Sequence, residues 1–406
     1  MNAFSALAWL NFFIADVRDG LGPYLGVFLR EYHFGESHIG LTSASLCALI
    51  FGIPLGIFID KTHFKRGIIA LCIVGIVLAT GANYFYPHFA FTLMAQIAIA
   101  LCGVCLAPAF SAITLGLVGQ NGYSKQVSLN EAYKHAGTAF SAGLSFVFAL
   151  YYGIGAIFVI TALMGVLALI FLALLRSSQI NHAVACGRED SAEIPLWKAL
   201  SDVRVLLLGV VVFCFHLSNA YMLPLLSQRA HTLGVDSSGA YAAATILIAQ
   251  CTMIGISLLC MRLLQTKGIP HFSSIYAYLM GIALFELIVR GGVAAHFEGI
   301  AGMVIVQILD GVGAGIVGVI LPLLVAMLMR GSGHINAAFA CAMTFGGIGG
   351  ALSGSLGGFV AQYFGYFYAY LVLAFVAACG LLIWVFGYRI LHTRATIDWV
   401  AAYKQD

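Results

Sequence analysis

Charged residues are scarce in this chain of 406 residues: they make up 9% of the sequence, whereas hydrophobic residues make up 62%. A soluble domain usually carries about a quarter charged residues. The mean hydropathy of +1.00 implies more apolar surface than a folded core could bury, which excludes a water-soluble protein and predicts a lipid bilayer as the solvent. The formal net charge of +3 is too small to indicate a nucleic-acid partner.

Sequence motifs of pumps and enzymes are absent as well. The chain has no GxxxxGKS or GxxxxGKT loop for a nucleotide phosphate, no HExxH zinc motif and no GxSxG nucleophile elbow. The ten cysteines lie mostly in apolar segments and form no disulfide framework, so we interpret Cys102 and Cys105 as packing residues. We therefore expect no cofactor, no resident metal and no enzymatic activity.

Long apolar runs dominate the sequence that remains. A membrane-spanning helix needs about 20 mostly apolar residues, and we predict an all-α membrane protein with twelve such helices. The predicted spans lie near residues 6–29, 39–59, 67–86, 91–117, 128–151, 154–175, 204–227, 239–263, 272–290, 299–327, 335–360 and 366–391. The first run has no basic segment before it and contains acids, so we expect it to be a retained span rather than a cleaved signal peptide.

One long polar segment divides the spans into two sets of six. The predicted organisation is a first six-helix bundle (1–176), a cytoplasmic linker (177–203), a second six-helix bundle (204–391) and a cytoplasmic tail (392–406). If both termini are cytoplasmic, fourteen Lys and Arg residues fall on the inner side and only Arg30, Arg229 and Arg290 on the outer side. The positive-inside rule therefore predicts cytoplasmic N and C termini.

The two halves also resemble each other in sequence. "REYHFGESHIG" (30–40) matches "RAHTLGVDSSG" (229–239) at an arginine and two glycines, and "LNEAYKHAGTAFSAG" (129–143) is similar to "INAAFACAMTFGGIG" (335–349). These matches indicate a duplicated six-helix unit, which is the design of many secondary transporters.

The segment "GIFIDKTHFKR" (56–66), between the second and third predicted spans, resembles the cytoplasmic signature of the major facilitator superfamily. The resemblance covers nearly the whole chain and implies two pseudo-symmetric six-helix bundles, alternating access and a monomer. It implies that Asp60 caps the N-terminus of helix 11 in one conformation and releases it in another, since a carboxylate there meets free N–H groups. The gating residues so implied are Gly56, Asp60, Lys61, Lys65 and Arg66. The alternative is that these residues only anchor a helix end at the lipid headgroups.

Three further segments resemble a bacterial subgroup of this superfamily: "FIADVRDGLGPYLGVFL" (13–29), "NEAYKHAG" (130–137) and "QILDGVGAGIVGV" (307–319). Some relatives in that subgroup move carboxylate siderophores, so the resemblance implies a carrier in the bacterial inner membrane. Proton coupling is expected separately, because a buried acid in a cavity that is alternately wet and closed can change its protonation. The fourth span lacks the buried arginine that is frequent in the superfamily, and the fifth lacks the glycine-proline signature of its antiporters. Both departures disfavour drug/proton antiport.

Charged side chains within the predicted spans give the candidate site. A charge at the bilayer centre costs about 2.5–3.5 kcal/mol, so such residues face protein, water or each other. On an ideal helix Asp16 and Asp19 lie about 60° apart, while Arg18 points about 200° away from Asp16. At least one of these residues therefore needs a partner on another helix.

In the superfamily fold, helices 1, 4, 7 and 10 line a central cavity, and we expect helix 5 to contribute as well. Arg18 and Lys134 are the predicted clamps for an anionic group, because an arginine fork suits a carboxylate. The predicted substrate-binding residues are Arg18, Lys134, His135, His216, Asn219 and Gln307, and the predicted proton-coupling residues are Asp16, Asp19, Asp310 and Glu131. The resulting hypothesis is a secondary transporter for a small polar, anionic solute such as a carboxylate metabolite or siderophore.

Alternatives remain open at this point. The charges could form a structural network, Glu131 could neutralise Lys134, and His216 could be a packing residue. We interpret Glu286 and Arg290, spaced i,i+4, as an ordinary ion pair. Within the carrier class the alternatives are efflux of amphipathic compounds, or transport of a divalent metal by Asp16, Asp19 and His216. From another class, the chain could be a membrane enzyme or receptor that transports nothing.

Overall fold

The computed structural model of this protein describes residues 2–18, 25, 28–29, 47–188, 194–234, 240–265, 274–297 and 299–394. All regular structure within these residues is helical. The helices are α1 (Ala3–Arg18), α4 (Cys47–Lys61), α5 (Lys65–Phe85), α6 (Phe89–Tyr152), α7 (Gly155–Ala173), the 3-10 turn η1 (Ser177–Gln179), α8 (His182–Cys186), α9 (Leu196–Leu200), α10 (Val203–Asn219), α11 (Met222–Thr232), α12 (Ala240–Gln265), α13 (Ser274–His296), α14 (Gly299–Leu328), α15 (Ile335–Phe364) and α16 (Tyr366–Arg394).

Nine helical segments within the described residues are long and apolar enough to cross a membrane. One of them, in α6, holds two of the predicted spans: a helix of 64 residues would be about 96 Å long, three times the thickness of the hydrocarbon core. Gly119, at φ 67° and ψ 177°, breaks this helix between the predicted spans 91–117 and 128–151. The first two predicted spans lie partly outside the described residues, so the total of twelve stays a prediction.

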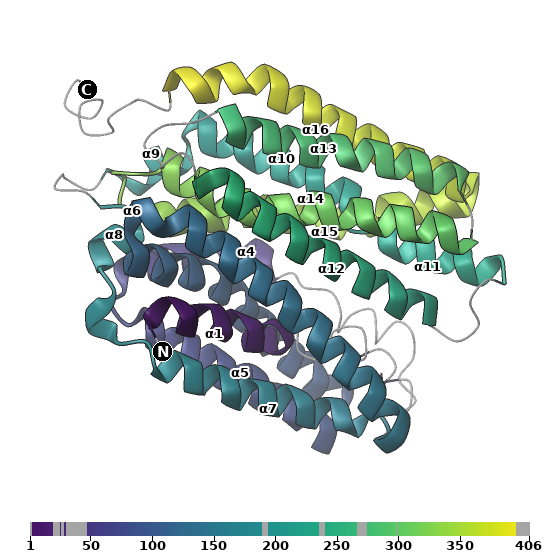
Figure 1. Ribbon diagram of the computed structural model, residues 1–406, viewed down its shortest axis with the longest axis horizontal. Coiled ribbons are helices and arrows are strands. Elements are labelled where there is room, and N and C mark those ends of the chain that lie inside the picture. Colours follow the sequence, from purple (N-terminus) through teal and green to yellow (C-terminus); the bar gives the residue numbers. More distant parts are fainter. Residues whose placement is uncertain are drawn as a thin grey trace.

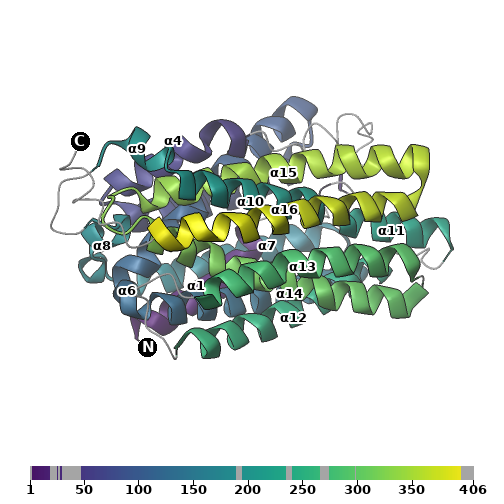
Figure 2. The ribbon, with the colours of Figure 1, turned by 90° about the horizontal axis from the view of Figure 1, so that it is seen from above.

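The long helices form two groups (Figure 1). The first helix group comprises α1 and α4–α7, and the second comprises α10–α16. The two groups meet where α6 packs on α12 and α4 packs on α15. Helix α1 begins and α16 ends at the same end of the molecule, where α8 and α9 also lie (Figures 1 and 2). We call this the linker end; that it faces the cytoplasm, and the residue boundaries of the two predicted bundles, stay predictions.

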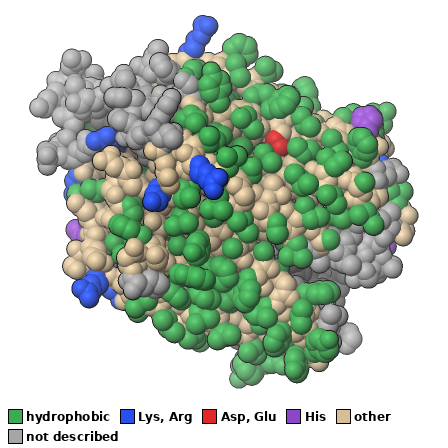
Figure 3. Space-filling view, viewed as in Figure 1, with side chains coloured by type: hydrophobic (Ala, Val, Ile, Leu, Met, Phe, Trp, Pro, Cys, Tyr) green, Lys and Arg blue, Asp and Glu red, His purple; other side chains and the backbone are tan. Residues whose placement is uncertain are grey.

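Two large apolar cores are present, and the larger extends from the second group into α6 of the first through Leu115 and Val127. The core of the first includes Leu7 of α1 and Ile69 of α5, and the core of the second includes Leu284 of α13 and Leu324 of α14. The face drawn in Figure 3 carries many hydrophobic side chains, and most Lys and Arg side chains visible on it lie toward the linker end. Leu78 of α5 is 66% exposed, as expected for a side chain that faces lipid.

Glycines on α15 allow close packing between helices of the second group. The sequence has Gly346, Gly350, Gly354 and Gly358 at every fourth position, which predicts a flat strip for a neighbouring helix. A Cβ added at Gly346 would lie 2.7 Å from the ring of His216 on α10, and one at Gly350 would lie 3.8 Å from Ala220 just after α10. The strip therefore faces α10, and the prediction of a packing surface is confirmed.

Candidate functional site

A cavity of about 420 Å³ lies between the two helix groups, and we call it the central cavity. Helices α1, α6, α10, α12, α14 and α15 contribute to its wall, so both halves of the chain build it. Its polar lining residues are Asn11, Arg18, Ser111, Thr114, Tyr123, Asn130, Glu131, Lys134, His135, Thr138, His216, Asn219 and Gln250. Apolar residues such as Phe110, Met253 and Phe339 complete the wall. A mixed lining of this kind suits a small solute with a few polar groups.

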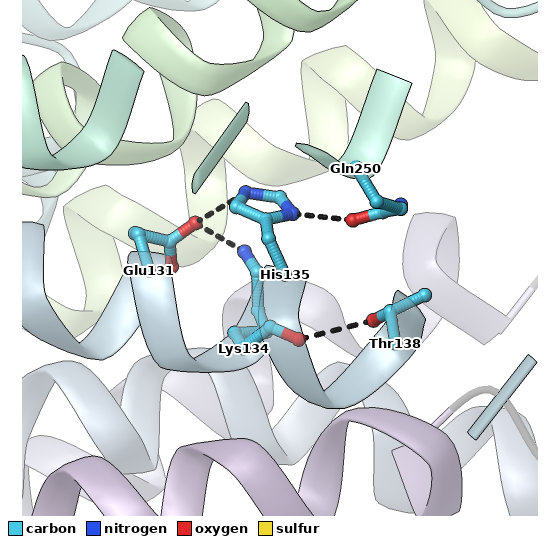
Figure 4. A network of polar contacts seen from close by, with 5 residues as sticks. All are labelled: Glu131, Lys134, His135, Thr138 and Gln250. Atoms are coloured by element: carbon cyan, nitrogen blue, oxygen red, sulfur yellow. Dashed lines mark hydrogen bonds and ion pairs between the residues drawn. The ribbon is translucent and has the colours of Figure 1, made fainter. Parts of the chain in front are cut away.

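One polar network joins the two groups across the central cavity (Figure 4). Lys134 forms an ion pair with Oε2 of Glu131, one turn earlier on α6, which is the pairing considered above as an alternative to the clamp. Nε2 of His135 lies 3.6 Å from the same Glu131 oxygen. Nδ1 of His135 lies 2.8 Å from Oε1 of Gln250 on α12, where the ring nitrogen donates and the amide oxygen accepts. A ligand that binds at Lys134 or His135 would therefore contact a network with members in both helix groups.

Arg18 reaches the central cavity from the last residue of α1. Its side chain is half-buried, and no hydrogen bond or ion pair joins it to another of the described residues. Asp16, also half-buried, does not line the cavity, and Asp19 lies outside the described residues. The first helix thus supplies the cavity with one cation that is available to an anion.

Helix α10 supplies two of the predicted residues. His216 lines the cavity, while its ring packs against Gly346 of α15. Asn219 also lines the cavity, and its backbone carbonyl accepts a hydrogen bond from Nη2 of Arg290 at 3.3 Å. The His216 ring therefore packs on α15, as in the packing alternative considered above, and also borders the central cavity.

Helix α14 contributes other residues than the sequence predicted. Gln307 is 2% exposed and is not part of the cavity lining, and Asp310 is ion-paired with Arg290 of α13. Ala314, Val317 and Leu321 line the cavity instead. Successive positions among these five are three or four residues apart, so all five share one face of the helix. The cavity lies one to three turns farther along this face than the predicted residues.

The predicted ion pair between Glu286 and Arg290 is wrong. Arg290 pairs with Asp310 across the α13–α14 contact, and neither carboxyl oxygen of Glu286 has a hydrogen-bond partner among the described residues. Spacing along one helix brought the two side chains within reach, but a carboxylate from the neighbouring helix offers Arg290 a better position.

The contact expected of Asp60 is present at the linker end. Oδ1 of Asp60 accepts hydrogen bonds from the backbone N of Asn336 at 3.1 Å and from its Nδ2 at 2.7 Å, and Oδ2 accepts one from the N of Ala337 at 2.8 Å. These residues form the N-terminus of α15, so the carboxylate of α4 caps a helix of the other group. Gly56 makes this approach possible, because a Cβ there would lie 2.7 Å from the carbonyl oxygen of Asn336.

The basic residues after Asp60 take different positions. Lys65 is buried and donates to the carbonyl oxygen of Thr62 at 2.5 Å, which closes the turn between α4 and α5. Lys61 is exposed, and Arg66 is half-buried and lines a smaller recess beside His63. Of the predicted gating set, only Gly56 and Asp60 reach the opposite helix group through the contacts described above.

Several polar residues of the cavity were missed by sequence reasoning, which considered mainly titratable side chains. Gln250 and Asn11 are amides inside apolar runs, and Asn130 donates to the hydroxyl of Thr114 at 3.1 Å. A search for any strongly polar side chain within a predicted span would have found them, since each needs a partner at that depth.

Three comparisons with known proteins bear on this chain. The family model described as "Major Facilitator Superfamily" matches residues 7–295. An uncharacterized MFS-type transporter from Mycobacterium tuberculosis, in strains CDC 1551 / Oshkosh and ATCC 25618 / H37Rv, is 32% identical over 392 residues, which cover 94% of this chain and 91% of the relative.

Solved structures with the same fold include the human organic anion transporter MFSD10 (TETRAN), with a TM-score of 0.70 and 13% identity over 94% of this chain and 99% of that one. The Escherichia coli fucose:proton symporter FucP (N162A) has a TM-score of 0.66 and 16% identity over 94% of this chain and 98% of that one. At these identities the likeness shows the fold alone.

Proposed function

The chain belongs to the Major Facilitator Superfamily of transporters, and we propose that it is a secondary transporter that moves a small anionic solute by alternating access, with protons as the coupling ion. The substrate class is a carboxylate metabolite or a carboxylate siderophore. The protein works in the bacterial inner membrane, as a monomer with both termini in the cytoplasm.

The observation that carries this proposal is the position of Arg18. Arg18 borders the central cavity, and its side chain has no hydrogen bond or ion pair with another described residue. A cation at this depth is costly unless water or an anion compensates it. A carboxylate can accept two parallel hydrogen bonds from one guanidinium, which favours this group over other anions of similar size.

Proton coupling follows from the second cation of the cavity. Lys134 is neutralised by Glu131, so a substrate carboxylate that approaches Lys134 competes with Glu131. Once displaced, the Glu131 carboxylate faces the new anion and avoids the repulsion by taking up a proton. Anion and proton then bind together, which makes the carrier a symporter. Asp16, Asp19 and Asp310 remain further candidates for the proton.

Alternating access requires a contact that forms in one conformation and opens in another. The cap that Asp60 places on α15 joins the two helix groups at the linker end. We assign it the role of a latch, which closes this end of the central cavity and must break before the cavity opens there. Gly56 permits the approach, and Lys61, Lys65 and Arg66 hold the turn at the headgroup level.

Two relatives in fold illustrate the chemistry that this architecture supports. One is described as an organic anion transporter and the other as a fucose:proton symporter. The divalent-metal alternative has less support, because Asp16 does not line the central cavity and no group of three metal-ligating side chains occurs within the part of the chain that the structure describes.

A carboxylate panel tests the proposal. We expect at least one mono-, di- or tricarboxylate to raise the melting temperature of the purified protein. In the Arg18→Gln variant its affinity should fall about 10- to 100-fold, because a charge-assisted hydrogen bond contributes about 1.5–3 kcal/mol. Arg262→Gln, at an exposed arginine of α12 outside the cavity, is the control. Unchanged affinity in Arg18→Gln, measured by calorimetry, would reject the anion clamp.

A further inference from the structure

A second group of charged residues lies inside the second helix group, away from the central cavity lining. Glu286 on α13 is 4% exposed, and neither of its carboxyl oxygens has a hydrogen-bond partner within the described residues. Its carboxyl lies against Gly313 of α14, where an added Cβ would collide with Oε2. The helix contact thus leaves room for the carboxyl but gives it no donor.

The nearest cation is committed elsewhere. Arg290, one turn after Glu286, is 2% exposed, and its Nη1 forms an ion pair with Oδ1 of Asp310 on α14. Its Nη2 donates to the carbonyl of Asn219, and its Nε lies 3.1 Å from Sδ of Met222. All three guanidinium nitrogens therefore have partners other than Glu286.

The charges that act on Glu286 can be counted. Among the residues that the structure describes, Arg290 on its own helix and Asp310 on α14 are the charged groups close enough to affect it. Helices α16 and α10 also pack on α13. Near this stretch α16 places the backbone of Tyr370 against Gly291, and α10 places Cys214 beside Leu284. Helix α11 contacts α13 as well, where Met222 reaches Arg290 and the cation Arg229 donates to the carbonyl of Ala294, one turn beyond Arg290. Two ionised acids and one guanidinium would leave a net negative charge in a buried site, which is strongly unfavourable without a partner.

We propose that Glu286, Arg290 and Asp310 form a proton-binding triad that holds one exchangeable proton. In the conformation described, the proton resides on Glu286 and Arg290 neutralises Asp310. When the guanidinium swings to Glu286, which is within reach at i,i+4, the proton passes to Asp310 and the triad stays neutral. The triad titrates as a unit, so the proton belongs to the set rather than to one residue.

The triad is connected to the central cavity through Asn219. The side chain of Asn219 lines the cavity, while its carbonyl accepts from Arg290, so a movement of Arg290 changes the backbone next to the cavity. The link to transport rests on the proposed function. The presence of the proton on Glu286 does not, and it can be measured without any substrate.

Infrared spectroscopy of the full-length protein in lipid nanodiscs tests the triad. A protonated buried carboxyl gives a carbonyl stretching band that shifts in D2O, and we expect this band at neutral pH in the unmodified protein. Glu286→Gln, which conserves shape, should remove it. Asp310→Asn should remove it as well, because Arg290 then becomes available to Glu286 and the proton is lost. Arg290→Gln should strengthen the band, since both acids would then be neutral.

The control is Asp202→Asn, which replaces an acid that is paired with Arg204 at the start of α10 and should leave the band unchanged. A band that persists in Glu286→Gln would overturn the assignment of the proton. A band that disappears in Glu286→Gln but persists in Asp310→Asn would overturn the exchange of Arg290 between the two acids. If Glu286→Gln does not fold, Asp310→Asn gives the answer: loss of the band supports the triad, and persistence of the band overturns it. None of these variants touches Arg18, so this test and the carboxylate panel can fail separately.

Discussion

Replacement of Asp60 by asparagine should open the contact between α4 and α15. Asp60 accepts three hydrogen bonds, two at Oδ1 and one at Oδ2. The asparagine oxygen can keep the two donors of Asn336, but its amide NH2 then faces the N–H of Ala337, which is completely buried. One charge-assisted hydrogen bond is lost, at about 1.5–3 kcal/mol. Because about 1.4 kcal/mol corresponds to a factor of ten, the ratio of closed to open molecules should fall about 10- to 100-fold.

The assay is a distance distribution between spin labels at the linker end. Cysteines at the exposed positions Arg176 and Arg262 report on the two helix groups, in a background where the exposed Cys251 is replaced by serine. In Asp60→Asn a longer distance should gain population. The matched control is Asp202→Asn. Asp202 also caps a helix, by accepting a hydrogen bond from the N of Arg204, but this contact does not connect the two helix groups. Identical distributions for Asp60→Asn and the parent protein would refute the latch.

Two further predictions concern coupling and stability. In Glu131→Gln, carboxylate binding should lose its pH dependence. The parent protein takes up one proton with each anion, so its affinity for the carboxylate falls by up to tenfold per pH unit as the pH rises. Calorimetry at several pH values measures this, and the same change of affinity with pH in both proteins would exclude Glu131. Gly349→Ala should lower the melting temperature, because the added Cβ would collide with the carbonyl of Phe213 and lie 3.0 Å from the N of Leu217. Such overpacking costs about 1–3 kcal/mol. Gly143→Ala, with open space at its Cβ, is the control, and equal melting temperatures for the two variants would contradict the close α10–α15 packing.

The sequence predicted features that depend on one helix or on a recognisable motif. Glycines at every fourth position are sufficient to predict a packing strip, because the strip is a property of a single helix. The contact of Asp60 with the N-terminus of α15 could be expected from a motif resemblance, since a carboxylate at a helix end has few other partners. Membrane location followed from composition alone.

Features that depend on the relative depth of two helices could not be predicted. The superfamily resemblance indicated that this helix lines the cavity, which led to the prediction of Gln307 and Asp310. How far the neighbouring helices slide along α14 is a matter of packing, which places Ala314 and Leu321 at the cavity instead. The partner of Arg290 was mistaken for the same reason: the i,i+4 spacing to Glu286 is visible in the sequence, and the approach of Asp310 from α14 is not. Gln250 was missed because it lies in the eighth predicted span, whereas the expected lining came from helices 1, 4, 5, 7 and 10.

The central claim is that an aqueous cavity between the helix groups receives the charged side chains, and thiol labelling tests it most directly. Thr138 lines the cavity and is half-buried, whereas Leu78 is 66% exposed on the outer, lipid-facing surface. A water-soluble maleimide should modify Thr138→Cys in membrane vesicles and leave Leu78→Cys unmodified, although Leu78 is the more exposed residue. Modification of Leu78→Cys with no reaction at Thr138→Cys would contradict the account.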